Sequence, residues 1–204
     1  MEEVLDLYAE PYDPQRPRVC IDERPCQLLG EVVEPLPMEP GQPRRIDSQY
    51  ERKGTCSLLL SFQPERGWRQ VEVSQRRTSQ DFALWMKRLV DEQFPQAQVI
   101  RLVLDNLNTH TPAALYQTFE PEEARRLTQK LEFHYTPKHG SWLNMAEIEF
   151  SALVRQCLGQ RIADLERLQQ EVSACAQQRN EQGATVQWRF TAEKARVKLH
   201  RLYH

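Results

Sequence analysis

The chain has 204 residues and a mass of 24.0 kDa, which is enough for one domain of ordinary size. Its 40% hydrophobic content supplies a core and excludes a wholly disordered protein, while its apolar runs are too short for a membrane span. Five scattered cysteines, an odd number, do not form a disulfide framework and favour a reducing, cytoplasmic compartment. The N-terminus is acidic and therefore resembles neither a signal nor a transit peptide.

The net charge of −2 hides an uneven distribution of charge. Residues 40–88 hold 10 basic and 5 acidic side chains, and the last twenty residues hold 5 basic and 1 acidic. Basic segments on a weakly acidic body are compatible with binding a polyanion such as DNA, and equally with ordinary solvated faces. Charge alone does not decide between these interpretations.

The N-terminal half is predicted to begin outside the domain and then to form strands. Residues 1–17 contain three prolines and predict an arm or linker. Two short apolar runs within 18–33 predict a β-hairpin, and the proline-rich segment 34–50 predicts an exposed loop. Strands are expected at 55–62 and 68–75, joined by a tight turn.

The C-terminal half alternates helices and strands. The expected elements are helices at 79–94 (N-capped by Thr78), 112–130 (interrupted at Pro121), 144–158 and 163–180, and strands at 99–106 and 131–137. The early strands are linked too tightly for helical crossovers, so a purely parallel sheet is excluded. The pattern predicts an α/β fold with a mixed sheet, followed by a basic, aromatic tail.

Three segments place a carboxylate where an apolar element ends. Asp22 and Asp105 each follow a strand-like run, and ligands of α/β sheets gather beyond the carboxyl ends of strands. The helix over 144–158 offers Glu147 and Glu149, and its apolar stripe leaves Glu147 on the flank from which a site at the sheet edge is within reach. Carboxylates from separate elements are the ligands that a two-metal phosphoryl-transfer site needs, although each acid alone is more often a surface charge.

Three motifs, in this order, resemble a known family. They are VCIDERPCQLLGE at 19–31, LVLDNLNTH at 102–110 and HYTPKHGSWLNMAEIEF at 134–150. In them the chain resembles the DDE transposases of bacterial insertion sequences, in the group related to the mariner transposases. The resemblance implies a ribonuclease H-like fold with a mixed central sheet flanked by helices, a catalytic domain over 18–182, an arm over 1–17 and a basic tail over 183–204.

The resemblance also implies the site and its chemistry. Asp22, Asp105 and Glu147 match the three metal-binding acids, because the last acid of the family falls three residues after the asparagine found here as Asn144. Two Mg²⁺ ions, replaceable by Mn²⁺, would serve cleavage of double-stranded DNA at the element's ends and strand transfer into a target, with a TA target suggested. A homodimer on DNA, no membrane association and a bacterial cytoplasm with nucleoid association are expected.

Candidate DNA-binding residues lie around these motifs. One basic group precedes the predicted strand at 55–62, and a second group lies beside the last two acids. An ordinary structural or solubilising role is the alternative for each of these side chains. The candidates are Arg44, Arg45, Arg52, Lys53, His110, Lys138, His139 and Trp142.

Two alternatives remain open from the sequence. The family usually carries helix-turn-helix domains ahead of the catalytic domain, and nothing in this sequence corresponds to them, so the chain could be an inactive DNA-binding or oligomerising remnant of a truncated transposase. A zinc module built on Cys20 and Cys26 is the other alternative, although their spacing matches no paired metal-binding pattern.

Overall fold

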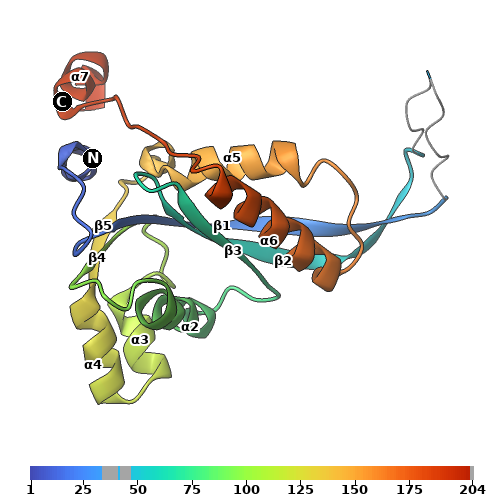
Figure 1. Cartoon of the computed structure of the whole chain (residues 1–204), viewed down its shortest axis with the longest axis horizontal. Helices are drawn as coiled ribbons and strands as arrows, with labels where there is room; N and C mark the ends of the chain where they lie inside the picture. The colour runs from blue at the N-terminus through green and yellow to red at the C-terminus, as the bar shows by residue number, and fades with distance from the viewer. Residues whose placement is uncertain (34–40, 42–46, 203–204) are drawn as a thin grey trace.

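The structure, a computed structural model, describes residues 1–33, 41 and 47–202. Its centre is a five-stranded sheet with the order β3-β2-β1-β4-β5 (Figure 1). The strands are β1 (Arg18–Glu31), β2 (Tyr50–Gln63), β3 (Trp68–Ser74), β4 (Ile100–Leu104) and β5 (Leu131–Tyr135). The helices are α1 (Glu2–Ala9), α2 (Ser79–Arg88), η1 (Leu89–Gln93), α3 (Pro112–Thr118), α4 (Pro121–Lys130), η2 (Ser141–Leu143), α5 (Ala146–Gln156), α6 (Leu165–Glu181), α7 (Ala192–Lys198) and η3 (His200–Leu202).

The sheet is mixed because its two halves are connected differently. β1, β2 and β3 are antiparallel neighbours, with a tight turn between β2 and β3, whereas β4 lies parallel to β1, and β5 parallel to β4, after helical connections. The predicted α/β fold with a mixed central sheet flanked by helices is therefore confirmed.

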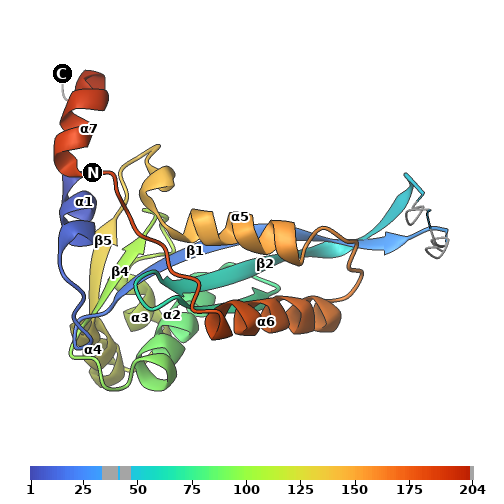
Figure 2. The ribbon, with the colours of Figure 1, turned by 45° about the horizontal axis from the view of Figure 1, so that its top comes forward.

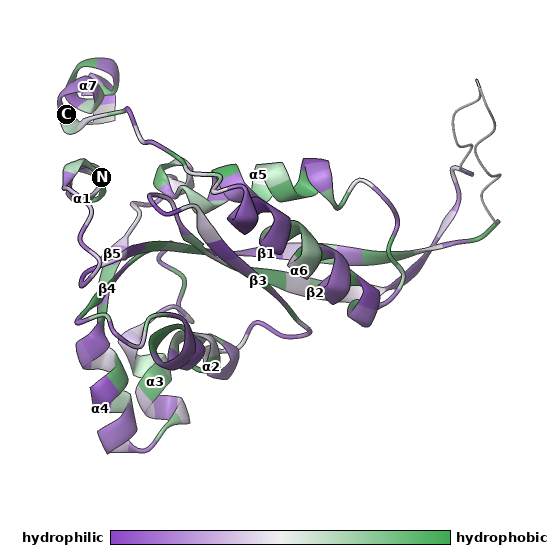
Figure 3. Cartoon of the chain, in the orientation of Figure 1, coloured by the Kyte–Doolittle hydropathy of each residue, from purple (hydrophilic) through white to green (hydrophobic). Residues whose placement is uncertain are grey.

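Helices cover both faces of the sheet, and the pleat sends alternate side chains to each (Figure 2). On β1, Cys20 joins the core beneath α5, α6 and α1, while Ile21 joins the core formed with α2, α3 and α4. Figure 3 shows hydrophobic residues along the central strands and hydrophilic residues over much of α4 and α6. Each core is thus a layer between the sheet and one set of helices.

The hairpin predicted for 18–33 is wrong, because β1 is one long strand that pairs with β2 along its length. Its pairing with β4 covers only Arg18, Val19 and Cys20. Beyond that point, β1 is an edge strand among the described strands, and an edge tolerates a proline such as Pro25.

The termini also differ from the prediction of an arm and a tail. In α1, Val4, Leu5 and Leu7 are buried in the core beneath α5, so residues 2–9 are an integral helix. The C-terminal segment folds back as α7, and Arg196 pairs with Glu2 of α1 at 2.7 Å. Figure 2 shows α1 and α7 side by side. None of the helices built from the described residues has the length and apolar content of a membrane span.

Candidate active site beside β1 and β4

The two aspartates lie just beyond the parallel pairing of β1 with β4: Asp22 is inside β1, and Asp105 directly follows β4. Cys20 of β1 is in register with Val103 of β4, and both belong to the core beneath α5. Asp22 and Asp105 each follow two residues later, and alternation of side chains assigns them to that same face. Because β4 ends at Leu104, Asp105 is the first residue beyond the carboxyl end of its strand.

Asn144 fixes the start of α5 beside Asp22. Its buried side-chain amide donates a hydrogen bond of 2.8 Å to the carbonyl oxygen of Ile21, and its side-chain oxygen accepts one of 3.1 Å from the N–H of Ala146. The carbonyl of Asn144 accepts a further bond of 3.1 Å from the N–H of Glu147. The exposed Glu147 is therefore held in the first turn of a helix that is fastened to the strand residue preceding Asp22.

The surroundings of Asp22 disfavour its charged form. Burial raises the pKa of Asp22 to about 7, against the opposing effect of the Glu23 N–H, which donates to the Asp22 carboxylate at 2.8 Å. The negative charges of Glu147 and Asp105 raise this pKa further. Within the described part of the chain, no three His, Cys, Asp or Glu side chains are grouped closely enough to hold a metal ion as they stand.

His110 joins the second aspartate to β1. Its Nδ1 lies 2.6 Å from Asp105 Oδ1 and its Nε2 lies 3.2 Å from Glu23 Oε1, while its ring packs against Phe82 with centroids 4.8 Å apart. Burial lowers the pKa of His110, but the hydrogen bonds and charges of Asp105 and Glu23 outweigh this and raise it to about 9. The imidazole is thus a cation that donates from both nitrogens.

The burial of His110 corrects the prediction that this side chain binds DNA. The ring is 0% exposed, so it is not available to contact the DNA backbone and instead orients Asp105. Nothing in the sequence predicts Glu23 as the second partner of His110 or Asn144 as the anchor of α5. The only signals are that Glu23 follows Asp22 and that Asn144 lies three residues before Glu147.

Glu149, the acid not preferred in the sequence analysis, is a structural residue. Its fully buried carboxylate contacts Arg69 of β3 at 3.0 Å and Arg179 of α6 at 2.6 and 2.8 Å. These ion pairs tie α5 to β3 and α6. Glu149 therefore faces into the layer, whereas Glu147, two residues earlier, is exposed.

The candidate DNA-binding residues fall into two separate groups. Lys138, His139 and Trp142 are exposed in the turn that precedes α5. Arg52 and Lys53 are exposed on the outer part of β2, where Arg52 is opposite Leu29. Leu29 is seven residues beyond Asp22 on β1, roughly 24 Å along an extended strand, so this second group is remote from the acids. Arg44 and Arg45 lie outside the described residues.

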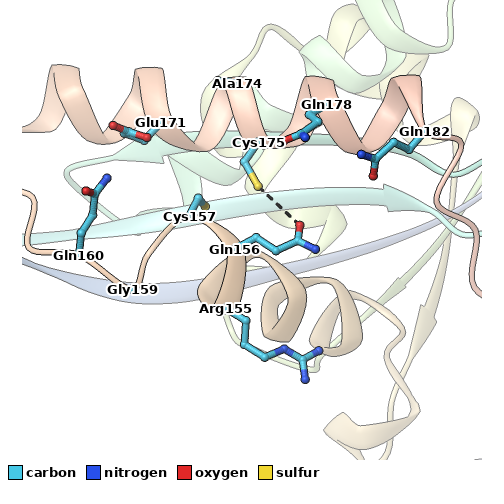
Figure 4. Close-up of a pocket in the computed structure, with 10 residues that line it drawn as sticks. All are labelled: Arg155, Gln156, Cys157, Gly159, Gln160, Glu171, Ala174, Cys175, Gln178 and Gln182. Carbon is cyan, nitrogen blue, oxygen red and sulfur yellow. Dashed lines mark hydrogen bonds between the residues drawn. The ribbon is translucent and has the colours of Figure 1, made fainter. Parts of the chain in front are cut away.

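A pocket of about 640 Å³ lies between α5 and α6, but it is not the site of the acids (Figure 4). Its lining comes from the C-terminal end of α5, including Arg155 and Cys157, and from Cys175 and Gln178 of α6. Glu147 is two turns earlier on α5, roughly 12 Å along the helix axis.

The cysteines of the zinc alternative lie on β1 without forming a metal site. Cys20 is buried, with its sulfur 3.5 Å from the Tyr8 hydroxyl, and Cys26 is opposite Cys56 on β2. Because the described residues contain no group of three potential metal ligands, this alternative has no ligand set there.

Comparisons with known proteins agree with this architecture. The family described as DDE superfamily endonuclease matches residues 17–169. The Mos1 mariner paired-end complex with Mn has the same fold, with a TM-score of 0.58 and 17% identity over 90% of this chain and 55% of the Mos1 chain. The Mos1 strand transfer complex gives a TM-score of 0.55 and 14% identity over 89% and 56%. The Mos1 paired-end complex with Mg gives 0.52 and 16% over 90% and 58%.

The chain spans little more than half the length of these Mos1 chains. No curated protein matches the sequence. At such low identities, the likeness to Mos1 establishes the ribonuclease H-like fold, and the family match establishes membership. The chain belongs to the DDE superfamily endonucleases, as its motifs indicate.

Proposed function

We propose that this chain is the catalytic domain of an insertion-sequence transposase that cleaves DNA strands and joins them to a target in a metal-dependent reaction. The observation that carries the proposal is the position of three carboxylates around β1. Asp22 lies within β1, Asp105 directly follows β4, which pairs with β1, and Glu147 lies in the first turn of α5, which Asn144 bonds to β1. Carboxylates from three elements beside one sheet edge are the donors that such chemistry requires.

The donor set suits Mg²⁺ or Mn²⁺. Asp22, Asp105 and Glu147 offer only oxygen atoms, which hard divalent cations prefer. Burial first, and then the negative charges of Glu147 and Asp105, raise the pKa of Asp22, and a bound cation would neutralise that charge. Two bound ions would activate the attacking hydroxyl and neutralise charge on the scissile phosphate. Solved Mos1 complexes with Mn and with Mg share the fold.

The other residues of the site would position these acids. The His110 cation holds the Asp105 carboxylate through Nδ1, which leaves the second carboxylate oxygen of Asp105 available. Asn144 keeps the first turn of α5 against β1, so that Glu147 stays near Asp22. Reaction would therefore depend on fixed positions and charge rather than on a covalent protein intermediate.

Double-stranded DNA is the proposed partner. Lys138 and His139 would contact phosphates beside the acids, and Arg52 and Lys53 would contact DNA farther along β2. Arg44 and Arg45, which lie outside the described residues, are proposed to bind DNA as well. We further propose a homodimer that holds two DNA ends, and a TA target. The Mos1 relatives are described as paired-end and strand transfer complexes.

A cleavage assay tests the proposal. Supercoiled plasmid and labelled duplex are incubated with the chain and Mg²⁺ or Mn²⁺, beside Asp105→Asn and a chelator control. Nicking that requires the metal and is lost in Asp105→Asn is the expected result. DNA binding without nicking would favour an inactive remnant, and equal nicking by both proteins would refute the assignment of the acids.

A further inference from the structure

Three aromatic side chains form a continuous surface beside the candidate active site, here termed the aromatic wall: Trp142, Trp188 and Phe190. The indoles of Trp142 and Trp188 are stacked, with centroids 6.3 Å apart and planes at 22°, and Phe190 meets Trp142 edge-on at 5.7 Å. Trp142 remains 44% exposed, although Trp is a residue that folding usually buries. A large apolar ring is therefore supported on one side and open to solvent.

The aromatic wall is held rigidly. The Trp188 indole N–H donates to the Phe190 carbonyl at 2.7 Å, and the Tyr8 ring packs against Trp188 with centroids 5.3 Å apart. The Tyr8 hydroxyl also donates to the carbonyl of Leu143, the residue after Trp142, at 2.8 Å. Preorganised rings lose little conformational entropy when a ligand stacks on them.

Trp142 directly follows a strained turn. His139 is the one non-glycine residue with a positive φ among the described residues, at 63°. At Gly140, a Cβ atom would lie 2.6 Å from Pro137 Cγ, so only glycine fits. Strain of this kind persists where the surrounding structure enforces it and is concentrated at functional sites.

Trp142, one of the three rings of the aromatic wall, lies close to Glu147 along the chain. Trp142 is two residues before Asn144, which is bonded to the strand residue preceding Asp22, and five residues before Glu147. The turn before α5 and the segment that carries Trp188 lie beside each other at the start of α5 (Figure 2). A group stacked on Trp142 would therefore be a near neighbour of the reacting phosphate.

Positive charge flanks the rings. Lys138 is four residues before Trp142, and Arg189 separates Trp188 from Phe190. Both side chains are exposed, and neither forms an ion pair with an acid in the described part of the chain. Exposed aromatic rings with neighbouring unpaired cations are the combination that binds single-stranded nucleic acid, in which bases stack and phosphates pair with the cations.

From this geometry we infer that Trp142 is a stacking site for an unpaired nucleobase next to the scissile phosphate. Inside a duplex, both faces of a base are covered by its neighbours, so a ring on the protein can stack only on a flipped-out or terminal base. The inference rests on the proposed function for its choice of DNA as ligand, and it adds the specific requirement that one nucleotide be unstacked.

The test compares two labelled duplexes that differ in one nucleotide. One carries a single unpaired 2-aminopurine, whose fluorescence reports stacking, and the other is fully paired. Affinities are measured with the full chain in chelator, so that no cleavage intervenes. The wild type should prefer the duplex with the unpaired base, and Trp142→Ala should reduce that preference by about 5- to 150-fold, the equivalent of about 1–3 kcal/mol per stacked base.

Two matched variants separate stacking from charge and from folding. Trp142→Phe should retain most of the preference and of the fluorescence change, because a smaller aromatic ring still stacks. Lys138→Ala should weaken the binding of both duplexes equally and leave the ratio of the two affinities unchanged. An unchanged ratio in Trp142→Ala, or a wild type that does not distinguish the duplexes, would overturn the inference.

The outcome is independent of the cleavage assay. If the chain nicks DNA in a metal-dependent reaction but Trp142→Ala does not change the ratio of the two affinities, the stacking site is refuted and the proposed function is retained. A Trp142-dependent ratio in a chain that never nicks DNA would refute the proposed function and retain the stacking site.

Discussion

His110 connects two carboxylates from different strands, and this contact has consequences for activity and for stability. Replacement by alanine removes the group that orients Asp105 and leaves the Glu23 carboxylate, whose side chain is 5% exposed, without a cationic partner. Loss of an orienting partner of a metal ligand typically costs about 10- to 100-fold in affinity or activity. Breaking a buried ion pair costs about 3–5 kcal/mol.

We therefore predict that His110→Ala lowers the nicking rate about 10- to 100-fold at saturating metal and lowers the free energy of unfolding by about 3 kcal/mol. Initial nicking rates and urea titrations measure the two effects. The exposed His200 offers a matched control, since His200→Ala should change neither. A His110→Ala variant with normal activity would contradict the orienting role.

The candidate acids could be proposed from the sequence because motif order and strand ends are local features. Their supporting residues could not. The bond from His110 to Glu23 spans 87 residues, and that from Asn144 to Ile21 spans 123. No spacing rule predicts such contacts, because they exist only once β1, β4 and α5 have packed together.

Helix α5 carries two glutamates with opposite roles, which provides a matched pair of substitutions. Glu147→Gln should abolish nicking and leave stability within about 0.5 kcal/mol of wild type, as expected for an exposed residue. Glu149→Gln should lower the free energy of unfolding by about 3–5 kcal/mol, because Arg69 and Arg179 lose a buried counter-charge. Denaturant titrations and nicking assays on both variants check this. The reverse pattern would mean that the acids have been assigned to the wrong roles.

Helices α2 and α4 are joined by ion pairs whose strength depends on pH. Hydrogen bonds from Arg126 and then Lys87 lower the pKa of Glu123 from 4.5 to about 2. Because the folded-state pKa lies below the unfolded one, the stabilisation is fully present above about pH 5 and is lost as the pH falls through 4.5 towards 2.

We predict that Glu123→Gln costs at most about 1 kcal/mol at pH 7, because the partially exposed charges are screened by solvent. Urea titrations of both proteins between about pH 7 and pH 3 should give a difference that shrinks below pH 4.5 and also shrinks in high salt. A difference that grows as the pH falls would contradict the assignment.

An element can be predicted from the sequence when the residues that determine it are neighbours along the chain. The break between α3 and α4 at Pro121 and the N-cap of α2 at Thr78 follow from neighbouring residues, and both predictions are confirmed. The hairpin predicted at 18–33 is wrong because β1 pairs with β2, which begins only at Tyr50, and because a proline on an edge strand does not end that strand.

At the scale of the whole molecule, the two termini close one end of the fold. The proline content of residues 1–17 predicts a linker. Leu5 of α1, however, is only 1% exposed and belongs to the core beneath α5. Leu5→Ala is predicted to lower the free energy of unfolding by about 2–4 kcal/mol, whereas the exposed Asp6→Ala should have little effect. Denaturant unfolding measures both, and equal stability of the two variants would restore the interpretation as a separate arm.

The central claim is that Asp22, Asp105 and Glu147 act together on a divalent cation, and the binding of Mn²⁺ tests it most directly. Free Mn²⁺ can be followed by its paramagnetic resonance signal during titration with the wild type, with Asp22→Asn, Asp105→Asn and Glu147→Gln, and with the surface control Glu166→Gln. Each of the three substitutions should weaken binding at least about tenfold, as loss of one charged ligand predicts, while the control binds normally. Equal Mn²⁺ affinity in the wild type and all three variants would contradict the account.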